Sequence, residues 1–328
     1  MAFIVAVEGC LMLTANVPFH DIYSNFIELS PVHNENIARL ILWEKLTTLP
    51  QNTPDADIVT VGDSSGFYGL VPEIVESQLQ GGKLLNMNCC SDIGLDGYFQ
   101  IVHYLTENMK NPRAILLSIT PHAVLSDQPN DLSTQLRQQF ILPSKLLKFP
   151  SMRYRLPISN LVFHREWRDE LWFRRAEERK TWNEMRDALT THRGWAPVPE
   201  ITGRKSPKVR CMRWDAEKQA AIKANRDEAP SLLPGLRRIA EFTKGRNIRF
   251  FVVFNPVSCP LESNPVVQEI RRQMEQFEQE HPETRIRMKI PRVWDEDRFH
   301  DIWHLRNEGV RLNSLEVGSA LGLALADR

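Results

Sequence analysis

Short apolar runs alternate with amphipathic segments along much of this chain of 328 residues, and this alternation constrains the fold more than any other feature. Each run is rich in β-branched or aromatic residues and is bounded by turn residues, as is typical of a buried strand. Five strands are expected, at 58–61, 83–88, 114–119, 248–254 and 285–290. Six helices are expected around them, at 35–49, 67–76, 98–109, 232–244, 264–280 and 308–325. Strands that alternate with helices favour a parallel sheet covered on both faces, so we predict an α/β three-layer sandwich.

Residues 123–235 interrupt this alternation with several prolines and no clear strand. One long helix is expected at 164–190, where large apolar residues including Trp167, Trp182 and Leu189 recur at helical spacing and many arginines occupy the other face. We therefore predict a helical cap inserted between the third and fourth strands. Its tryptophans could stack on sugar rings, but an amphipathic helix that buries them explains the pattern more simply.

Residues 1–19 are mostly apolar, which raises the question of membrane attachment. A spanning helix needs about 20 apolar residues, and a signal peptide normally begins with Lys or Arg, so the segment fits neither pattern fully. It is either a buried helix or a membrane anchor or signal segment, and the polar and aromatic residues at 18–31 favour the anchor. Residues 20–328 then form one α/β domain that contains the insertion.

Charge and cysteine usage exclude several classes of function. Lys+Arg and Asp+Glu number 41 each, which argues against a nucleic-acid partner held by bulk charge. Phosphate-cradling glycine loops are absent, so a nucleotide enzyme is disfavoured, and without a Cys-x-x-Cys pair neither a zinc ribbon nor another metal or cofactor site is expected. The adjacent residues Cys89 and Cys90 are not expected to bridge each other, whereas a long-range disulfide to Cys211 or Cys259 stays open.

The strand at 58–61 ends in the turn Gly-Asp-Ser-Ser-Gly at 62–66. A serine in a strand-to-helix turn presents its hydroxyl at the carboxyl edge of the sheet, where sites form in open parallel sheets. The helix N-terminus beside it offers N–H groups to a developing anion. Ser64 is the candidate nucleophile and Ser65 is its rival. A purely structural helix cap is the alternative, because Asp and Ser both favour N-cap positions.

Asp301 and His304 stand three residues apart just before the last expected helix. This spacing lets the carboxylate orient the imidazole while the other ring nitrogen faces a nucleophile. An imidazole has a pKa near neutrality and can carry the serine proton in both directions. His300 lacks this spacing to Asp301, and a His–Asp capping pair is the structural alternative.

Together, the Gly-Asp-Ser block at 62–64 and the Asp-x-x-His-Leu block at 301–305 resemble the SGNH (GDSL-type) hydrolase superfamily. The two blocks occur in the order of that superfamily, at the two ends of an α/β pattern. The resemblance implies a flavodoxin-like three-layer sandwich with a parallel sheet, and a catalytic triad of Ser64, Asp301 and His304.

The oxyanion hole is the part of the pattern from which this sequence departs. The superfamily adds a glycine from the loop after the second strand and an asparagine from a Gly-x-Asn block after the third. Here the loop at 88–94 offers a backbone N–H from Ser91 or Gly94, and Thr-Pro-His at 120–122 contains no asparagine. Loss of one side-chain donor costs a factor of roughly 100 to 1,000 in rate. Either another donor substitutes, or turnover is slow, or catalysis has been lost.

Proteins of the envelope-polysaccharide branch of the superfamily, which resemble alginate O-acetylation factors and the teichoic-acid D-alanylation protein, share such departures. The resemblance to their layout implies a serine esterase or O-acyltransferase, membrane-anchored and facing the periplasm or exterior. Its substrate would be an acylated carbohydrate carrying O-acyl (acetyl) groups, and a membrane O-acyltransferase could be its partner. A catalytically inactive protein that binds polysaccharide or that acyltransferase is the alternative from another class. A soluble lipase-like esterase would require residues 1–19 to be a cleaved signal or a core helix.

Overall fold

The computed structural model describes residues 41–42, 44–46, 48–50, 52–110, 112–120, 176–198, 232–258, 265–286, 288 and 292–326. The predicted anchor at 1–19 and the cap helix before residue 176 lie outside this part of the chain. The described residues of 41–52 are helical, in agreement with the helix predicted at 35–49. Within the described ranges, no helix is both long and apolar enough to cross a membrane.

Four strands in the described part of the chain form one all-parallel sheet, namely β1 (Ile58–Gly62), β2 (Leu84–Asn86), β3 (Ala114–Ile119) and β4 (Arg249–Phe254). Their spatial order is β2-β1-β3-β4, and the register places Ile58 opposite both Leu84 and Ala114. The direction of strand addition therefore reverses at β1. In open α/β sheets, ligands bind outside the carboxyl ends of the strands at such a reversal.

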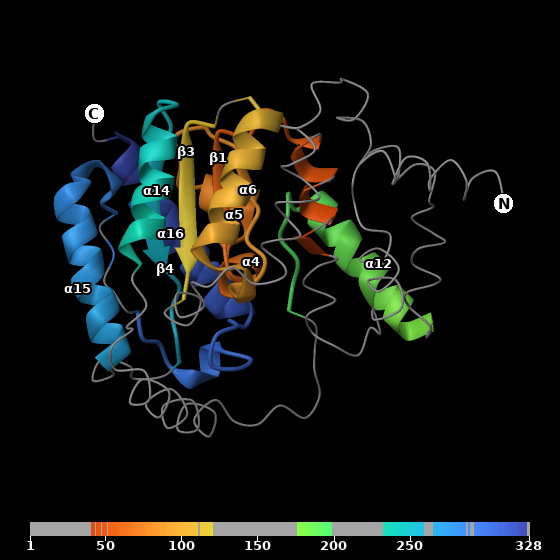
Figure 1. Cartoon of the computed structure of the whole chain (residues 1–328). Helices are drawn as coiled ribbons and strands as arrows, with labels where there is room; N and C mark the ends of the chain where they lie inside the picture. The colour runs from red at the N-terminus through yellow and green to blue at the C-terminus, as the bar shows by residue number, and fades with distance from the viewer. Residues whose placement is uncertain are drawn as a thin grey trace, which may run out of the picture.

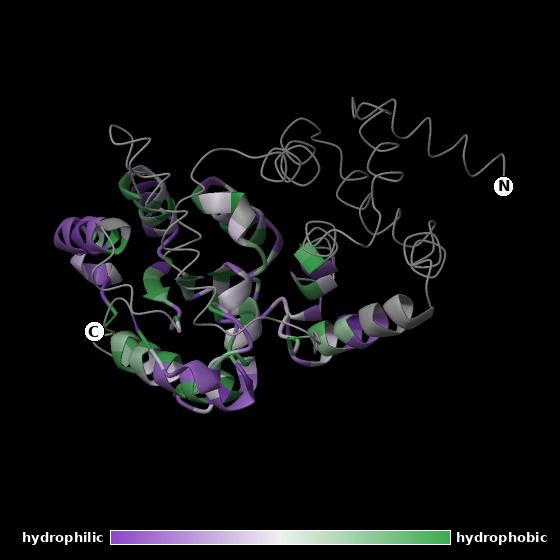
Figure 2. Ribbon diagram, turned by 90° about the horizontal axis from the view of Figure 1, so that it is seen from below, coloured by the Kyte–Doolittle hydropathy of each residue, from purple (hydrophilic) through white to green (hydrophobic). Residues whose placement is uncertain are grey.

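Helices cover both faces of the sheet, which confirms the predicted three-layer arrangement of an α/β fold (Figure 1). Alternate strand residues point to opposite faces, so Val59 and Ile115 join one core cluster while their neighbours Ile58 and Leu116 join the other. Helices with residues in the first cluster include α6 (Gly94–Asn108), α12 (Ala176–Thr191), α14 (Leu233–Lys244) and α15 (Pro265–Glu280), and those in the second include α5 (Pro72–Glu76) and α16 (Asn307–Ala326). In Figure 2, α15 turns hydrophilic residues outward and hydrophobic residues toward the interior.

The predicted strands are found close to their expected positions, except for the fifth. β2 is shorter than the predicted range 83–88. The described residues of the range 285–290 are Arg285, Ile286 and Met288, and none of them is in a strand. Ile286 is nevertheless buried, in the same cluster as Phe251 of β4. Burial alone therefore accounts for the apolar signal that predicted a strand there.

The helix predicted at 67–76 is two short helices in the structure. α4 (Ser64–Gly69) begins three residues earlier than expected, and α5 begins at Pro72. Proline disfavours helical backbone in the residue before it, and Val71 is extended, with φ −85° and ψ 117°. The break at Leu70 and Val71 leaves α4 as a separate short helix over the ends of the strands.

Within the insertion, the segment that follows α12 contacts the free side of β2 at Arg193 and Gly194. The Asn86 N–H donates to the Arg193 carbonyl at 2.9 Å, and Arg193 Nε donates to the Leu84 carbonyl at 3.2 Å. Gly194 has φ +97°, and a Cβ added there would lie 2.0 Å from the Asn86 carbonyl oxygen. Only glycine fits at this position, so the insertion returns to the sheet by a backbone approach that a side chain would block.

Candidate active site

Asp63 fixes the start of α4, the helix that carries Ser64. Its carboxylate accepts hydrogen bonds from the N–H groups of Ser65 and Gly66 at 2.9 and 3.3 Å. It also accepts from the N–H and the hydroxyl of Thr120, each at 2.6 Å. Burial raises the pKa of Asp63, and these four hydrogen bonds work in the opposite direction. The carboxylate thus ties the α4 N-terminus to the end of β3.

These contacts correct the expectation that the helix N-terminus is open to an anion. Two of its N–H groups are taken by Asp63, and the Phe67 N–H donates to the Asp63 carbonyl. Within the described part of the chain, the N–H of Ser64 itself donates no hydrogen bond. Both the N–H and the hydroxyl of Thr120 donate to Asp63. Any anion at this end of α4 would therefore meet the Ser64 N–H first.

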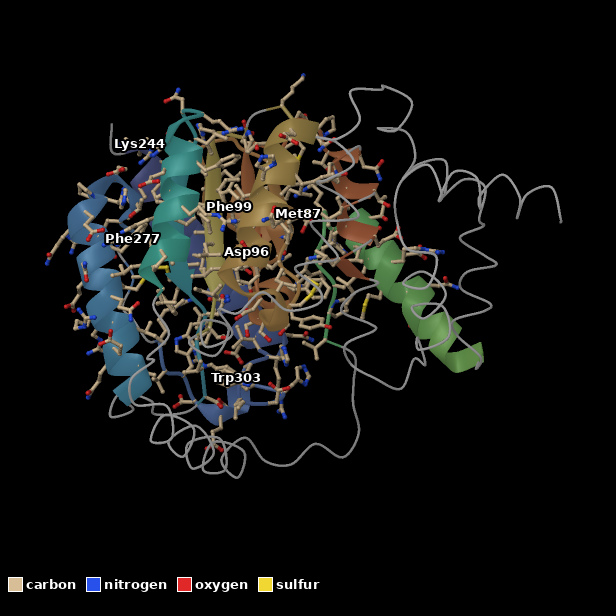
Figure 3. All side chains as sticks on the ribbon, in the orientation of Figure 1. Met87, Asp96, Phe99, Lys244, Phe277 and Trp303 are labelled. Atoms are coloured by element: carbon tan, nitrogen blue, oxygen red, sulfur yellow. A yellow bond between two sulfur atoms is a disulfide. The ribbon has the colours of Figure 1, made fainter. Side chains whose placement is uncertain are left out.

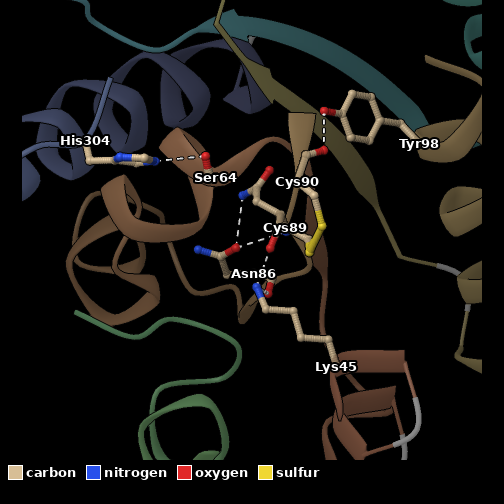
Figure 4. Close-up of a disulfide and its surroundings, with 8 residues drawn as sticks. Lys45, Ser64, Asn86, Cys89, Cys90, Tyr98 and His304 are labelled. Carbon is tan, nitrogen blue, oxygen red and sulfur yellow. Dashed lines mark hydrogen bonds between the residues drawn. A yellow bond between two sulfur atoms is a disulfide. The ribbon is translucent and has the colours of Figure 1, made fainter. Parts of the chain in front are cut away.

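Ser64, His304 and Asp301 form one hydrogen-bonded chain, although 240 positions separate the serine from the histidine. His304 Nε2 lies 2.9 Å from Ser64 Oγ (Figure 4). On the other side of the ring, His304 Nδ1 lies 2.9 Å from Asp301 Oδ2. With the ring proton on Nδ1, the imidazole donates to the carboxylate and accepts from the serine hydroxyl. The His304 side chain remains 18% exposed, so the group is accessible from outside.

The loop that carries Asp301 and His304 holds its own shape through the carboxylate. Asp301 Oδ1 accepts from the N–H groups of Trp303 and His304, each at 2.9 Å. Figure 3 labels Trp303 at the end of the molecule toward which the β3 arrow points in Figure 1. Burial by itself would raise the pKa of Asp301, but the His304 ring and the two N–H donors outweigh it and hold that pKa well below its usual range. Asp301 therefore stays ionised beside the imidazole.

The loop after β2 contains a disulfide between the adjacent residues Cys89 and Cys90, with an S–S distance of 2.04 Å (Figure 4). The expectation that these cysteines do not bridge each other was therefore wrong. The Cys89 N–H donates to the Gly62 carbonyl at 2.9 Å, and the Tyr98 hydroxyl donates to the Cys90 carbonyl at 2.9 Å. Both cysteines are buried, in the same core cluster as Val61 of β1 and Tyr98 of α6.

The two expected oxyanion residues follow this disulfide, in the 3-10 turn η1 (Ser91–Ile93) and directly after it. The Gly94 N–H donates to the Ser91 carbonyl and closes the turn, so this N–H is already used. We therefore no longer include Gly94 among the candidate donors. Ser91 is the first residue of the turn and is partly exposed, and it stays a candidate.

Two aromatic residues that the sequence did not single out lie on this side of the site: Tyr68 contacts the imidazole, and Trp195 contacts Tyr68. Tyr68 of α4 sets its ring edge-on to the His304 ring, with 5.3 Å between centroids. Trp195, from the segment of the insertion that follows α12, donates its indole N–H to the Tyr68 carbonyl at 2.8 Å and packs against the cluster that contains Leu305. Tyr68 lies within the helix expected after Ser64, which was a usable signal. No sequence pattern marks Trp195, because its position near Tyr68 depends on the long-range contacts between its segment and β2.

Within the described ranges, no group of three or more His, Cys, Asp or Glu side chains is arranged to hold a metal ion. Neither a scan against protein-family models nor a search of curated proteins finds a match for this chain. The site therefore has to be interpreted from its own geometry and from the resemblance of its two sequence blocks.

Proposed function

We propose that this protein is an SGNH-type serine esterase or O-acyltransferase. The observation that carries the proposal is the linear arrangement of Ser64, His304 and Asp301, with both side-chain separations at 2.9 Å. A nucleophile and a base within hydrogen-bond reach, with a third group orienting the base, are the geometric signature of an activated serine. The position of Ser64 at the carboxyl end of β1, where the strand order reverses, is also where an α/β sheet forms its sites.

The proposed reaction is acyl transfer in two steps. Ser64 Oγ forms a bond to the ester carbonyl carbon while His304 Nε2 takes the hydroxyl proton. The tetrahedral intermediate then expels the alcohol, which leaves with that proton, and an acyl-serine remains. Water or a sugar hydroxyl next attacks the acyl-serine carbonyl carbon and gives its proton to His304. The bond from Ser64 Oγ to the acyl group then breaks, His304 returns the proton to Ser64 Oγ, and the free acid or the acylated sugar leaves. Water makes the protein an esterase, and a sugar hydroxyl makes it an O-acyltransferase.

Asp301 and the backbone would supply the electrostatic part of catalysis. The ionised Asp301 stabilises the imidazolium that forms in each step, and it keeps the ring in the tautomer whose Nε2 can accept a proton. The N–H groups of Ser64 and Ser91 are the proposed donors to the oxyanion. Because Thr120 directs both of its donors at Asp63, we expect weaker oxyanion stabilisation and slower turnover than an added asparagine amide would give.

The proposed substrate is an O-acyl group, such as acetyl, on a cell-envelope polysaccharide. This assignment rests on the resemblance in layout to the envelope-polysaccharide branch, which also suggests a membrane O-acyltransferase as partner and an anchor at 1–19. The disulfide between Cys89 and Cys90 supports it, because disulfides persist in oxidising compartments such as the periplasm or the cell exterior.

A non-catalytic polysaccharide-binding protein of the same fold is the second candidate. Thr120 is the observation that favours it, since this residue replaces an oxyanion donor and is fully engaged with Asp63. The complete hydrogen-bonded chain from Ser64 to Asp301 favours the enzyme, because a site that has lost its activity has no need to keep all three groups aligned.

Labelling with a fluorophosphonate probe tests the proposal. Wild-type protein is expected to be labelled at Ser64, because the probe reacts with an activated serine. Ser64→Ala and His304→Ala should lose labelling, whereas Ser65→Ala, which alters the adjacent rival serine, should keep it. Folded wild-type protein that stays unlabelled would support the non-catalytic candidate, and labelling that survives in Ser64→Ala would assign the nucleophile to another residue.

A further inference from the structure

The helix that carries Ser64 is too short to hold its own orientation. α4 has six residues, and helices of this length are not stable in isolation. Asp63 and Thr120 hold its N-terminal end. The direction of the Ser64 hydroxyl also depends on what holds the other end, where the carbonyl groups of the last turn need donors from elsewhere.

One buried side chain, Asn86 at the end of β2, supplies donors to that end. Its amide nitrogen lies 3.2 Å from the Gly66 carbonyl oxygen, 3.2 Å from that of Phe67 and 2.8 Å from that of Leu70. Asn86 is fully buried, so these carbonyls are paired with the side chain rather than with solvent. Asn313 of α16 adds a fourth contact, from its amide nitrogen to the Gly69 carbonyl at 2.9 Å.

The Asn86 amide is itself held in one orientation. Its oxygen accepts from the Asn88 N–H at 3.1 Å and from the Asn88 amide at 3.0 Å, so its nitrogen must face α4. The Lys45 side-chain nitrogen donates to the backbone carbonyls of Asn86, at 3.0 Å, and of Asn88 (Figure 4). It also lies 3.9 Å above the Phe67 ring centroid. Lys45 is fully buried, and burial lowers its pKa well below the usual range. Lys45 therefore connects the backbone of β2 to the underside of α4.

We propose that Asn86 is a positioning residue for Ser64, and that Lys45 keeps Asn86 in place. The inference rests on the proposed function, because it assigns Asn86 the task of setting the Ser64 Oγ to His304 Nε2 separation. His304 is held mainly from outside α4, by the Asp301 carboxylate at Nδ1 and by the loop N–H groups that this carboxylate binds. The separation therefore follows the tilt of α4, and Asn86 holds three of the carbonyls that define this tilt.

A thiol at position 64 gives a readout that would stay unchanged if Asn86 only stabilised the fold. In a Ser64→Cys background, a thiol near a histidine has its pKa lowered from about 8.5, because the imidazolium stabilises the thiolate. The rate of alkylation by iodoacetamide, followed against pH by peptide mass mapping at position 64, reports this pKa directly. It depends on the distance to His304 and requires no ester substrate.

Asn86→Asp is the test variant and Asn108→Asp is its matched control. The first keeps the shape of the side chain but points an oxygen at three carbonyls. The second makes the same change at an exposed asparagine whose amide donates to the Tyr104 carbonyl at 2.7 Å, at the end of α6. We expect Asn86→Asp to raise the thiol pKa by about one pH unit and to slow alkylation about tenfold at pH 6, and Asn108→Asp to change neither. Circular dichroism selects a temperature at which every variant is folded.

The outcomes separate this inference from the proposed function. A folded Asn86→Asp variant with the parent alkylation profile would overturn the positioning role. A parent thiol that titrates near 8.5 would overturn both proposals, since His304 would then be too far away. A third outcome is that the thiol pKa of Ser64→Cys is lowered and Asn86→Asp raises it, while the fluorophosphonate does not label wild-type protein. This outcome would keep the positioning role and reject the enzyme. If Asn86→Asp does not fold, Lys45→Met is measured instead, and an unchanged profile there rejects the inference.

Discussion

At the scale of single residues, the ionised carboxylate of Asp301 both stabilises the fold and orients the imidazole of His304. The hydrogen bonds from His304 and the loop N–H groups keep the pKa of this buried carboxyl below its value in an unfolded chain. Because the folded pKa is the lower one, ionised Asp301 contributes to stability above about pH 4. This contribution is lost only as the pH falls through the lower folded value. The carboxylate thus orients the imidazole at every pH where the imidazole can act as a base.

Replacing Asp301 by asparagine tests its role in orienting the ring. An asparagine amide can donate to His304 Nδ1, which moves the ring proton to Nε2 and removes the acceptor for the Ser64 hydroxyl. We expect the fluorophosphonate labelling rate of Asp301→Asn to fall by a factor of about 10³ to 10⁴. Asp295→Asn, an exposed change that precedes the turn at 296–298 and involves no side-chain cap, should keep the wild-type rate. Equal rates in Asp301→Asn and wild type would show that the carboxylate does not select the tautomer.

The candidate triad could be predicted from sequence because its chemistry restricts both residue type and spacing. Asp301 and His304 are close in the chain, so three residues of local geometry suffice to join them. The use of the neighbouring donors could not be predicted in this way. Whether the N–H of Gly94 is available depends on a turn that closes onto Ser91, and Thr120 meets Asp63 only after β1 and β3 have paired.

The disulfide was missed for a related reason. Adjacent cysteines are seldom bridged, so a local rule argues against the bond between Cys89 and Cys90. Burial of both side chains between β1 and α6 leaves the two sulfur atoms next to each other, and no chain-local pattern encodes this burial.

Peptide mapping tests the bond between Cys89 and Cys90. Both cysteines lie in the tryptic fragment 84–110, which contains no internal Lys or Arg. In unfolded but unreduced protein, this fragment should take up no alkylating reagent, and after reduction it should take up two equivalents. A Cys89→Ser variant, whose remaining thiol has lost its adjacent partner, should be labelled without reduction. Labelling of the unreduced wild-type fragment, or its linkage to another peptide, would contradict the assignment.

At the scale of elements, the ends of the strands and α4 are packed against one another with very little space. A Cβ added at Gly62 would lie 1.7 Å from the Ser118 carbonyl oxygen, and one added at Gly66 would lie 2.7 Å from the Ser118 hydroxyl oxygen. The glycines of the turn at 62–66 thus allow α4 to sit directly over β1 and β3. The sequence predicted a tight turn here, but it did not show which neighbours make the turn tight.

Gly62→Ala is therefore expected to be strongly destabilising. The added methyl group meets backbone rather than a flexible side chain, so the β1–β3 pairing has to shift. We expect a loss of more than about 3 kcal/mol in the free energy of unfolding, measured by urea denaturation. Gly82→Ala is the control, because the nearest atom to its added Cβ is 3.7 Å away, and its free energy should stay within about 1 kcal/mol of wild type. Similar losses in both variants would mean that steric contact at Gly62 is not the cause.

At the scale of the whole molecule, the alternation of apolar runs was sufficient to predict the parallel sheet and its two helical layers. Strands buried on both faces must be apolar throughout, and this requirement is visible in a single sequence. The strand order is not visible in this way, because it depends on which side of β1 each connection crosses. The position of the insertion relative to the sheet depends on long-range contacts such as that between Arg193 and Asn86.

These contacts of Arg193 also bear on the solubility of the protein. β2 is an edge strand, and an exposed edge offers backbone donors and acceptors with which a strand of another molecule can pair. Arg193 takes up the Asn86 N–H and the Leu84 carbonyl on that side, and Gly194 brings its backbone close enough to cover them. The insertion thus shields the sheet from edge-to-edge association. A shortened chain that omits residues 123–235 would leave this edge open to a second copy, even with the triad intact.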